Sequence, residues 1–304
     1  MLTPHQIKNL LKQNNITALK SFGQNFLVSQ TAIDKVIEAS SITSADTIIE
    51  IGPGFGSLTF EIAKKANKVI AVEKDRKISS ILKQALIDKK ISNVEVINED
   101  VLKIQNAKVK SEKYNSKVKS EDKKKDAGFK LPTTNYKVVA NLPYNIAVAV
   151  VMKFLTSQNP PQEMVVMLQK EVAQRIVATP PKANKLAIFC QLYSTPKIIG
   201  YVPSTAFYPK PKVDSAILEL QPLGRRLPPS SFGEIERLVN IGFSHPRKTL
   251  LNNFVRGLPS YSLSKKSVVE WIKGAGLDPS QRPQTLTIHN WLTLAKTLKT
   301  FHNN

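Results

Sequence analysis

The feature that most constrains the fold of this chain is a regular alternation between short apolar runs and stretches with helical spacing, between about residues 31 and 168. The apolar runs are Thr47–Ile51, Val69–Glu73, Val94–Ile97, Tyr136–Ala140 and Met164–Leu168. Apolar strands without a polar face are typical of a parallel sheet that helices cover on both sides. The pattern therefore predicts an α/β fold with a mostly parallel, doubly wound sheet.

The alternation ends after Gln221, where four prolines and glycines between residues 222 and 229 form a linker. Beyond the linker, apolar residues recur at helical spacing around residues 232–242, 246–256, 264–275 and 288–299. We therefore expect two domains, one of residues 1–222 that contains the sheet and a small all-α domain of residues 223–304.

A lysine-rich segment, about residues 103–134, interrupts the first domain between two of the predicted strands. Residues 103–130 carry 10 basic and 4 acidic side chains and have neither strand nor helix periodicity. This composition is typical of a solvated insertion that packs against no core. The alternative is that this segment binds RNA.

The net charge of +21 indicates a polyanionic partner such as a nucleic acid. The charge is distributed unevenly, because residues 31–102 carry 10 basic and 11 acidic side chains inside an otherwise basic chain. A near-neutral block in a basic chain is expected if this part of the protein binds a ligand that needs no surrounding positive charge.

Composition also argues against several classes of protein. The longest apolar stretch, Ile146–Met152, is far shorter than the roughly 18 to 20 residues of a membrane span. The single cysteine, Cys190, excludes an intrachain disulfide, and four scattered histidines lack the spacing of metal ligands. Thr3-Pro4 is more typical of a helix start than of a targeting peptide. We expect a cytoplasmic, monomeric protein without a metal site or a membrane partner.

A glycine-rich turn, Gly52-Pro53-Gly54-Phe55-Gly56, follows the first predicted strand and precedes a helix. Glu73 ends the next strand, 21 residues after Gly52, where a carboxylate can accept hydrogen bonds from ribose hydroxyls. Asp100 follows the third strand and can accept from an adenine amino group. Any one of these features alone is more often structural, but together they predict a nucleoside cofactor. The turn lacks the dinucleotide glycine spacing and a basic residue, which favours S-adenosylmethionine over NAD.

The segment Asn141-Leu142-Pro143-Tyr144-Asn145 opens the helix after the fourth predicted strand. Turns with Asn and Pro are common, so the segment alone favours structure and function equally. Its position at the carboxyl end of a strand is where α/β sheets bind ligands. An amide, a backbone carbonyl that Pro143 turns outward and the Tyr144 ring suit a planar base with an amino group. We therefore consider Asn141–Tyr144 the candidate catalytic residues.

These motifs resemble those of the bacterial small-subunit ribosomal RNA adenine dimethyltransferases. The resemblance covers nearly the whole chain, in the segments Gly23–Leu27, Glu50–Gly54, Asn141–Asn145, Gln169–Val172 and Phe207–Ser215. It implies a Rossmann-like, S-adenosylmethionine-dependent methyltransferase domain followed by a helical RNA-recognition domain. It also implies a cofactor pocket formed by Asn25, Leu27, Gly52, Pro53, Gly54, Glu73, Asp100 and Asn141.

The activity implied by the resemblance is dimethylation of N6 on two adjacent adenosines near the 3′ end of small-subunit ribosomal RNA, in the pre-ribosomal small subunit. Asn141 and the Leu142 carbonyl would accept the N6 hydrogens, and Tyr144 and Phe207 would stack on a base that has left its helix. Phe207 could instead be a core aromatic. Arg247 and Lys248 are candidate RNA contacts, although an ordinary solvated surface is a nearly equal alternative.

Two rival functions remain at this point. A large-subunit ribosomal RNA adenine methyltransferase of the antibiotic-resistance type would share the fold and a similar catalytic turn. The Phe207–Ser215 segment and the Gln24–Leu27 start favour the small-subunit enzymes. A noncatalytic RNA-binding assembly or transcription factor would have lost cofactor or catalytic residues, and the sequence retains them.

Overall fold

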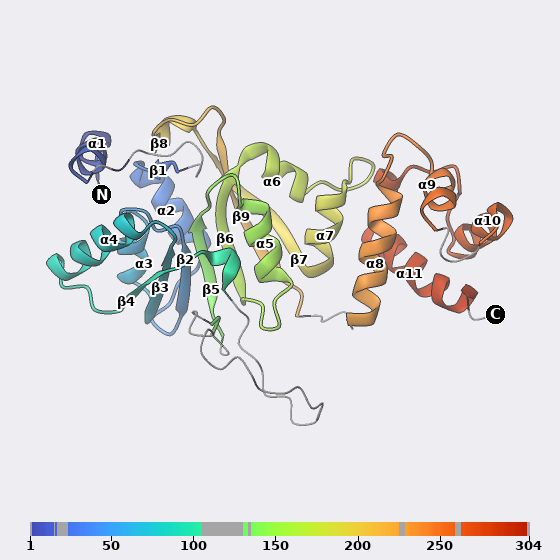
Figure 1. The fold of residues 1–304 in the computed structure, drawn as a ribbon, viewed down its shortest axis with the longest axis horizontal. Coiled ribbons are helices and arrows are strands. Elements are labelled where there is room, and N and C mark those ends of the chain that lie inside the picture. The colour runs from blue at the N-terminus through green and yellow to red at the C-terminus, as the bar shows by residue number, and fades with distance from the viewer. Residues whose placement is uncertain are drawn as a thin grey trace, which may run out of the picture. The chain divides into compact units, whose positions relative to one another are not determined.

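The computed structural model describes residues 2–14, 16, 24–104, 130–132, 135–224, 229–258 and 263–302 (Figure 1). Most of the lysine-rich segment at residues 103–134, and Gly23 of the first motif, lie outside the described residues. The chain divides into two compact units, one of Met1–Ala173 with Lys197–Pro222 and one of Gln174–Pro196 with Leu223–Asn304. Residues 174–196 thus group with the C-terminal helices, whereas the sequence-based boundary at residue 222 assigns them to the first domain.

The first unit is built on a seven-stranded sheet with the strand order β4-β3-β2-β5-β6-β9-β7. Strands β2 to β6 pair in parallel, and β9 runs antiparallel to β6. The predicted α/β fold with a mostly parallel sheet is therefore confirmed. The strands of the structure are β1 (Phe26–Leu27), β2 (Thr47–Ile51), β3 (Lys68–Glu73), β4 (Val94–Asn98), β5 (Lys137–Asn141), β6 (Glu163–Gln169), β7 (Ser194–Val202), β8 (Phe207–Tyr208) and β9 (Ser215–Pro222).

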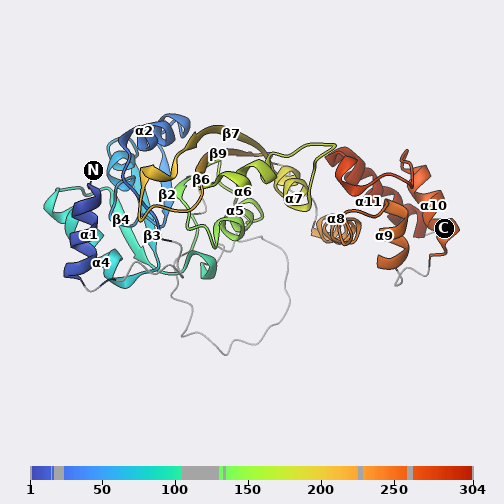
Figure 2. The ribbon, with the colours of Figure 1, turned by 90° about the horizontal axis from the view of Figure 1, so that it is seen from above.

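Helices cover both faces of this sheet, as its continuous apolar strands require. On one face, α2 and α3 pack against Ile48, Val69, Val139 and Val165, which are fully buried. Helix α5 lies on the opposite face, as Figure 2 shows. The elements of this unit are α1 (Pro4–Gln13), α2 (Gln30–Ala39), α3 (Thr59–Ala63), α4 (Arg76–Asp88), α5 (Ala147–Leu155) and the 3₁₀ turns η2 (Val101–Lys103) and η3 (Ser204–Ala206), with α6 (Lys170–Ile176) at the boundary of the two units.

The order of the strands reverses between β2 and β5. From β2 the chain winds outward through β3 to β4, and it then returns to β5 on the other side of β2. Right-handed crossovers place the helices of the two halves on opposite faces, so the loops after β2 and β5 diverge and leave a crevice at the carboxyl ends of these strands. This crevice is where an α/β sheet binds its ligand.

A short two-stranded ribbon joins distant parts of the sequence beside this crevice. Strands β1 and β8 pair antiparallel, with Phe26 opposite Tyr208 and Leu27 opposite Phe207. The Val28 amide also donates to the Ala206 carbonyl at 2.8 Å. This pairing places the end of the N-terminal motif directly beside the start of the Phe207–Ser215 motif.

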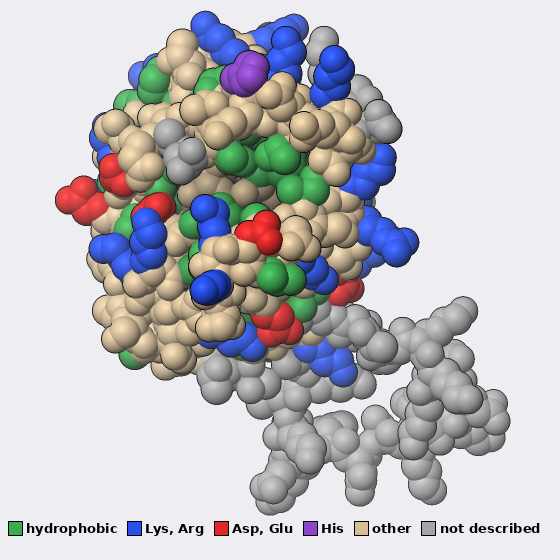
Figure 3. All heavy atoms as spheres, turned by 90° about the vertical axis from the view of Figure 1, so that its left-hand side faces the viewer, with side chains coloured by type: hydrophobic (Ala, Val, Ile, Leu, Met, Phe, Trp, Pro, Cys, Tyr) green, Lys and Arg blue, Asp and Glu red, His purple; other side chains and the backbone are tan. Residues whose placement is uncertain are grey.

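Acidic and basic side chains are interspersed on the face shown in Figure 3, around a hollow with exposed hydrophobic side chains. This is the side on which α4 lies in Figure 1. The mixture agrees with the balance of charges in residues 31–102.

The second unit is a helical bundle with its own core. Trp271, Trp291 and Phe254 are buried at its centre, with their rings in edge-to-face contacts. The predicted helix at 246–256 begins only at Leu250, because the Thr249 hydroxyl caps it by accepting from the Asn252 amide. The elements are α7 (Lys185–Tyr193), α8 (Pro229–Gly242), α9 (Leu250–Gly257), α10 (Lys265–Gly274), η5 (Pro283–Thr285) and α11 (Ile288–His302).

No helix within the described part of the chain is both long enough and apolar enough to cross a membrane. The same residues contain no group of three or more His, Cys, Asp or Glu side chains that could hold a metal ion. Cys190 is buried, and burial raises the pKa of its thiol to about 12.

Candidate active site

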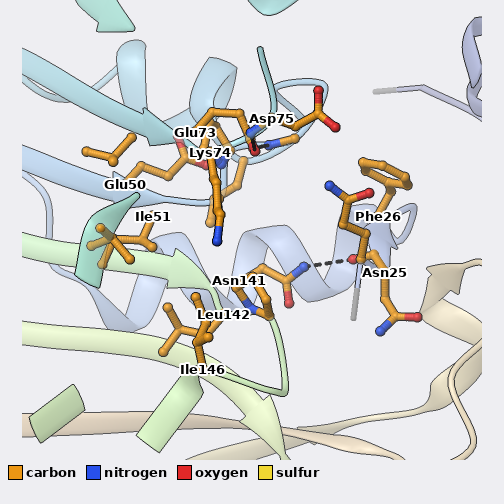
Figure 4. A pocket seen from close by; sticks show the side chains of 18 of the residues that line it. Asn25, Phe26, Glu50, Ile51, Glu73, Lys74, Asp75, Asn141, Leu142 and Ile146 are labelled. Atoms are coloured by element: carbon orange, nitrogen blue, oxygen red, sulfur yellow. Dashed lines mark hydrogen bonds between the residues drawn. The ribbon is translucent and has the colours of Figure 1, made fainter. Parts of the chain in front are cut away.

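A cavity of about 440 Å³ lies at the carboxyl ends of β2 and β5 (Figure 4). Its size is in the range of small-molecule sites. Its walls come from the segment before α2, the glycine-rich turn, the ends of β3 and β4, and the start of α5. The lining includes every residue predicted to bind the cofactor or perform catalysis: Asn25, Leu27, Gly52, Pro53, Gly54, Glu73, Asp100, Asn141, Leu142, Pro143 and Tyr144.

The glycine-rich turn is possible only with residues that lack a Cβ. Gly54 has a φ of +58°, and a Cβ there would lie 3.1 Å from Cδ1 of Phe26. Gly56 has a φ of +88°, and a Cβ there would lie 2.7 Å from Cδ1 of Leu82. Left-handed backbone is costly for other residues, so glycine permits both the sharp turn and the close packing beneath it. The turn thereby brings backbone to the wall of the cavity.

Glu73 is held rigidly at the end of β3. Its Oε1 accepts from the Asp75 amide at 2.8 Å, and its Oε2 accepts from the Gly54 amide at 3.3 Å. The side chain is 6% exposed, and burial raises its pKa despite these two hydrogen bonds. The Lys74 amide also contributes a hydrogen bond, and because a carboxylate has about four acceptor positions, the group retains capacity for a ligand. This geometry fits a ribose with two adjacent hydroxyls.

Asp100 lies on the adjoining wall. Its Oδ1 accepts from the Leu102 amide at 3.0 Å, and its Oδ2 forms an ion pair with Lys74 Nζ at 2.9 Å. Partial burial acts to raise the pKa of Asp100, but the hydrogen bonds and the charge of Lys74 outweigh it and lower the pKa. Asp100 is therefore an ionised acceptor. It suits the exocyclic amine of an adenine.

Asn141, at the last position of β5, has an amide group of fixed orientation. Its Nδ2 donates to the Asn25 carbonyl at 3.0 Å. A backbone carbonyl can only accept, so the NH₂ must face Asn25 and Oδ1 must point away from it, as Figure 4 shows. Oδ1 is therefore the atom of this amide that remains available as an acceptor, in a residue that lines the cavity. The contact also explains why the N-terminal motif belongs to the site.

Hydrogen bonds to two neighbouring strands and within the turn itself hold the residues after Asn141. The Leu142 amide donates to the Met167 carbonyl at 2.9 Å, and the Pro143 carbonyl accepts from the Ile146 amide at 3.1 Å. The Tyr144 hydroxyl is 2.8 Å from Oγ of Ser215 on β9, and partial burial raises the pKa of this tyrosine. The Tyr144 ring is thus tethered at its far end.

Comparison with known proteins decides which family combines these features. A sequence profile for the family described as ribosomal RNA adenine dimethylase matches residues 15–299. The chain belongs to the ribosomal RNA adenine dimethylase family. The ribosomal RNA small subunit methyltransferase A of Alkaliphilus metalliredigens is 38% identical, with 97% of each chain covered. The protein of the same name from Anoxybacillus flavithermus is 35% identical, with 97% of this chain and 95% of that protein covered.

Solved structures agree with membership of the dimethylase family. A dimethyladenosine transferase from Plasmodium falciparum superposes with a TM-score of 0.72 and 26% identity, over 91% of this chain and 98% of that one. The 23S rRNA methyltransferase ErmE shares the fold, with a TM-score of 0.67 and 22% identity over 90% of this chain and 100% of that one. The predicted Rossmann-like methyltransferase fold with a helical C-terminal part is therefore confirmed.

Three residues predicted to contact RNA do not line the cavity. Phe207 is 3% exposed and packs in the core with α2 and α3, so its ring is enclosed by other side chains. Arg247 and Lys248 are exposed in the turn before α9, in the second unit.

Glu50 is a buried charged residue of the cavity to which the sequence gave no individual role. Glu50, one position before the last residue of β2, lines the cavity although it is 1% exposed. Its Oε2 has no hydrogen-bond partner among the described residues. The signal in the sequence was an acidic residue inside an otherwise apolar strand, directly before the glycine-rich turn.

Proposed function

We propose that this protein transfers methyl groups from S-adenosylmethionine to N6 of adenosines in small-subunit ribosomal RNA. By family resemblance, two adjacent adenosines near the 3′ end are each dimethylated during assembly of the small subunit. The observation that carries the proposal is the orientation of Asn141, whose Nδ2 is committed to Asn25 and whose Oδ1 is left for a substrate amine. This acceptor stands beside a cavity with the ribose and adenine acceptors of a nucleoside cofactor.

S-adenosylmethionine, when bound, supplies a methyl group on a positively charged sulfur. The task of the chain is to prepare the amine, because the N6 lone pair of adenine is delocalised into the ring and is a poor nucleophile. Oδ1 of Asn141 and the carbonyl of Leu142 accept the two N6 hydrogens, which favours a pyramidal nitrogen with a localised lone pair. The S-adenosylmethionine held beside Glu73 and Asp100 would supply its methyl group to this lone pair and leave as the neutral thioether, and the N6 proton would pass to solvent.

Tyr144 positions the base in this proposal. A flipped adenine loses its stacking in the RNA, which costs a few kcal/mol. Stacking on an aromatic ring returns about 1–3 kcal/mol. The 2.8 Å contact between the Tyr144 hydroxyl and Ser215 restricts the ring, so little further entropy is lost when a base docks on it.

A large-subunit substrate is the main rival. Relatives that match this chain over nearly their whole length bear the small-subunit name, and this supports the small-subunit substrate. A noncatalytic role is disfavoured because the cofactor and catalytic residues together line one cavity.

A methylation assay separates these functions. The protein is incubated with labelled S-adenosylmethionine and either small-subunit particles from a strain that lacks the gene, or naked large-subunit RNA. We expect labelled N6,N6-dimethyladenosine in the small-subunit RNA alone. Labelling of the large-subunit RNA alone would favour the resistance-type enzyme. Failure of the cofactor to bind by calorimetry would favour the noncatalytic factor.

The remaining expectations belong to the same proposal. The protein acts as a cytoplasmic monomer, Arg247 and Lys248 contact RNA phosphates, and residues 223–304 form the RNA-recognition domain. The net charge of +21 supports phosphate binding, which predicts that RNA affinity falls steeply with salt. Replacing both basic residues by alanine should reduce that salt dependence, and light scattering gives the oligomeric state.

A further inference from the structure

Glu50 is an acid in an apolar setting at the wall of the cofactor cavity. Its neighbours in the sheet register are Ala71 on β3 and Val139 on β5, neither of which offers a polar partner. Thr59, at the start of α3, is also fully buried, and its hydroxyl is close enough to lower the pKa of Glu50 in part, but Oε2 of Glu50 has no well-aligned hydrogen-bond partner among the described residues. Figure 4 shows Glu50 on the same wall as Glu73. A buried polar atom without a partner is costly, so its presence on the wall of the cavity suggests a ligand.

The electrostatic state of Glu50 follows from this setting. Burial raises its pKa to about 8; the Thr59 hydroxyl lowers the pKa in part, and the charge of Glu73 raises it further. One unit below such a pKa, at pH 7, about nine in ten carboxyl groups carry a proton. In the cofactor-free protein Glu50 is therefore mostly neutral, in a setting where an ionised carboxylate would be poorly solvated.

A positive charge brought close to this carboxyl would reverse the balance, because an opposite charge favours the ionised form. The charges near Glu50 do not already do so. Glu73 is acidic, and the nearby cation Lys74 is paired with Asp100. Arg76 and Lys77 also line the cavity, but no basic residue is among the groups that set the pKa of Glu50, so a ligand can supply the opposite charge.

We propose that Glu50 is the charge-responsive residue of the cavity, protonated when the cavity is empty and ionised when the cationic methionine end of S-adenosylmethionine binds, with release of one proton to solvent. The inference rests on the proposed function for the identity of the cofactor. The O–H bond of Glu50 breaks, its electron pair stays on the carboxylate, and water or buffer takes the proton. The affinity of the cavity for a ligand then depends on the positive charge of that ligand as well as on the shape of its adenosine.

The coupling predicts a particular pH dependence. Affinity for S-adenosylmethionine should rise with pH up to about 8 and then level off, since above that value Glu50 is already ionised. A ligand with the same adenosine and a neutral sulfur, 5′-methylthioadenosine, should show no such coupling through Glu50. The site thus discriminates in favour of the charged cofactor.

Calorimetry on the full chain tests the proposal. The binding enthalpy at pH 7 is measured in phosphate and in Tris, whose ionisation enthalpies differ, and the difference gives the number of protons released. We expect close to one proton more for the wild type than for Glu50→Gln with S-adenosylmethionine, and no such difference with 5′-methylthioadenosine. We also expect Glu50→Gln to bind S-adenosylmethionine about tenfold more weakly, as for a lost contact with a charged group.

Glu95→Gln is the matched control, because Glu95 lies on β4 of the same sheet, is exposed and pairs with Lys68 outside the cavity. It should release as many protons as the wild type. Thermal denaturation checks that the variants fold, and the wild-type pH profile provides a measurement that needs no variant. If S-adenosylmethionine binds with an unchanged proton count in Glu50→Gln, this inference is overturned while the proposed function stands. If the wild type binds no S-adenosylmethionine, the proposed function fails.

Discussion

Replacing Asn141 by alanine removes two interactions that the structure separates. The first is the 3.0 Å hydrogen bond from Nδ2 to the Asn25 carbonyl, a partly buried contact worth about 1 kcal/mol of stability. The second is Oδ1, the acceptor proposed for the N6 amine. Losing a preorganised polar group that acts on developing charge costs roughly 3 kcal/mol, or on the order of a hundredfold in rate. The variant should therefore fold and bind RNA but methylate far more slowly.

Asn93→Ala is the matched control for this variant. The Asn93 amide donates to the carbonyls of Ala63 and Ala66 at 2.9 and 3.0 Å, away from the cavity. The control should lose as much stability as Asn141→Ala, or more, and still methylate at close to the wild-type rate. Single-turnover methylation, thermal denaturation and RNA binding are measured for both. Near-wild-type turnover of Asn141→Ala, or an equal loss of rate in both variants, would refute the catalytic assignment.

Three further variants test other parts of the site. Gly54→Ala should strain left-handed backbone by about 1–2 kcal/mol and crowd Phe26, which lowers the melting temperature and the affinity for S-adenosylmethionine; an unchanged affinity would contradict the role of the turn. Tyr144→Phe loses only the contact with Ser215 and should methylate well, whereas Tyr144→Ala should not; equal losses would mean that the hydroxyl matters more than the ring. Because the folded protein raises the pKa of Glu50 to about 8, the wild type should lose stability relative to Glu50→Gln as the pH rises from about 4.5 to 8. Urea denaturation at pH 5 and pH 8 measures this difference, and a constant difference would disprove the raised pKa.

Much of the first unit could be predicted because its signals are local. Apolar runs of strand length, glycines before a helix and acids at strand ends each require only a few consecutive residues. Strand β7 was missed because Pro196, Lys197 and Gly200 interrupt its apolar residues, so no continuous apolar run marks it. Residues 174–196 carry no boundary signal of their own. Only their packing, with Ile188 and Leu192 in the helical core, assigns them to the second unit.

The sequence predicted which residues line the site, but not how their side chains are oriented or enclosed. The sequence placed Asn141 in the site by resemblance, but the hydrogen bond that orients its amide comes from Asn25, 116 positions away. Phe207 was expected to stack on a base, and its enclosure in the core depends on the pairing of β8 with β1. Such contacts join segments that no local pattern connects.

By itself, the sequence determined the fold class and the order of strands β2 to β6 along the chain, because these follow from periodicity, and the dimethylase resemblance supplied the residues that line the cavity. The tertiary structure alone decided which amide atom of Asn141 faces the cavity, that Lys74 neutralises Asp100, and that Glu50 is buried without a partner. The physical reason is that orientation and protonation depend on the dielectric surroundings and on partners that folding brings together from distant parts of the chain.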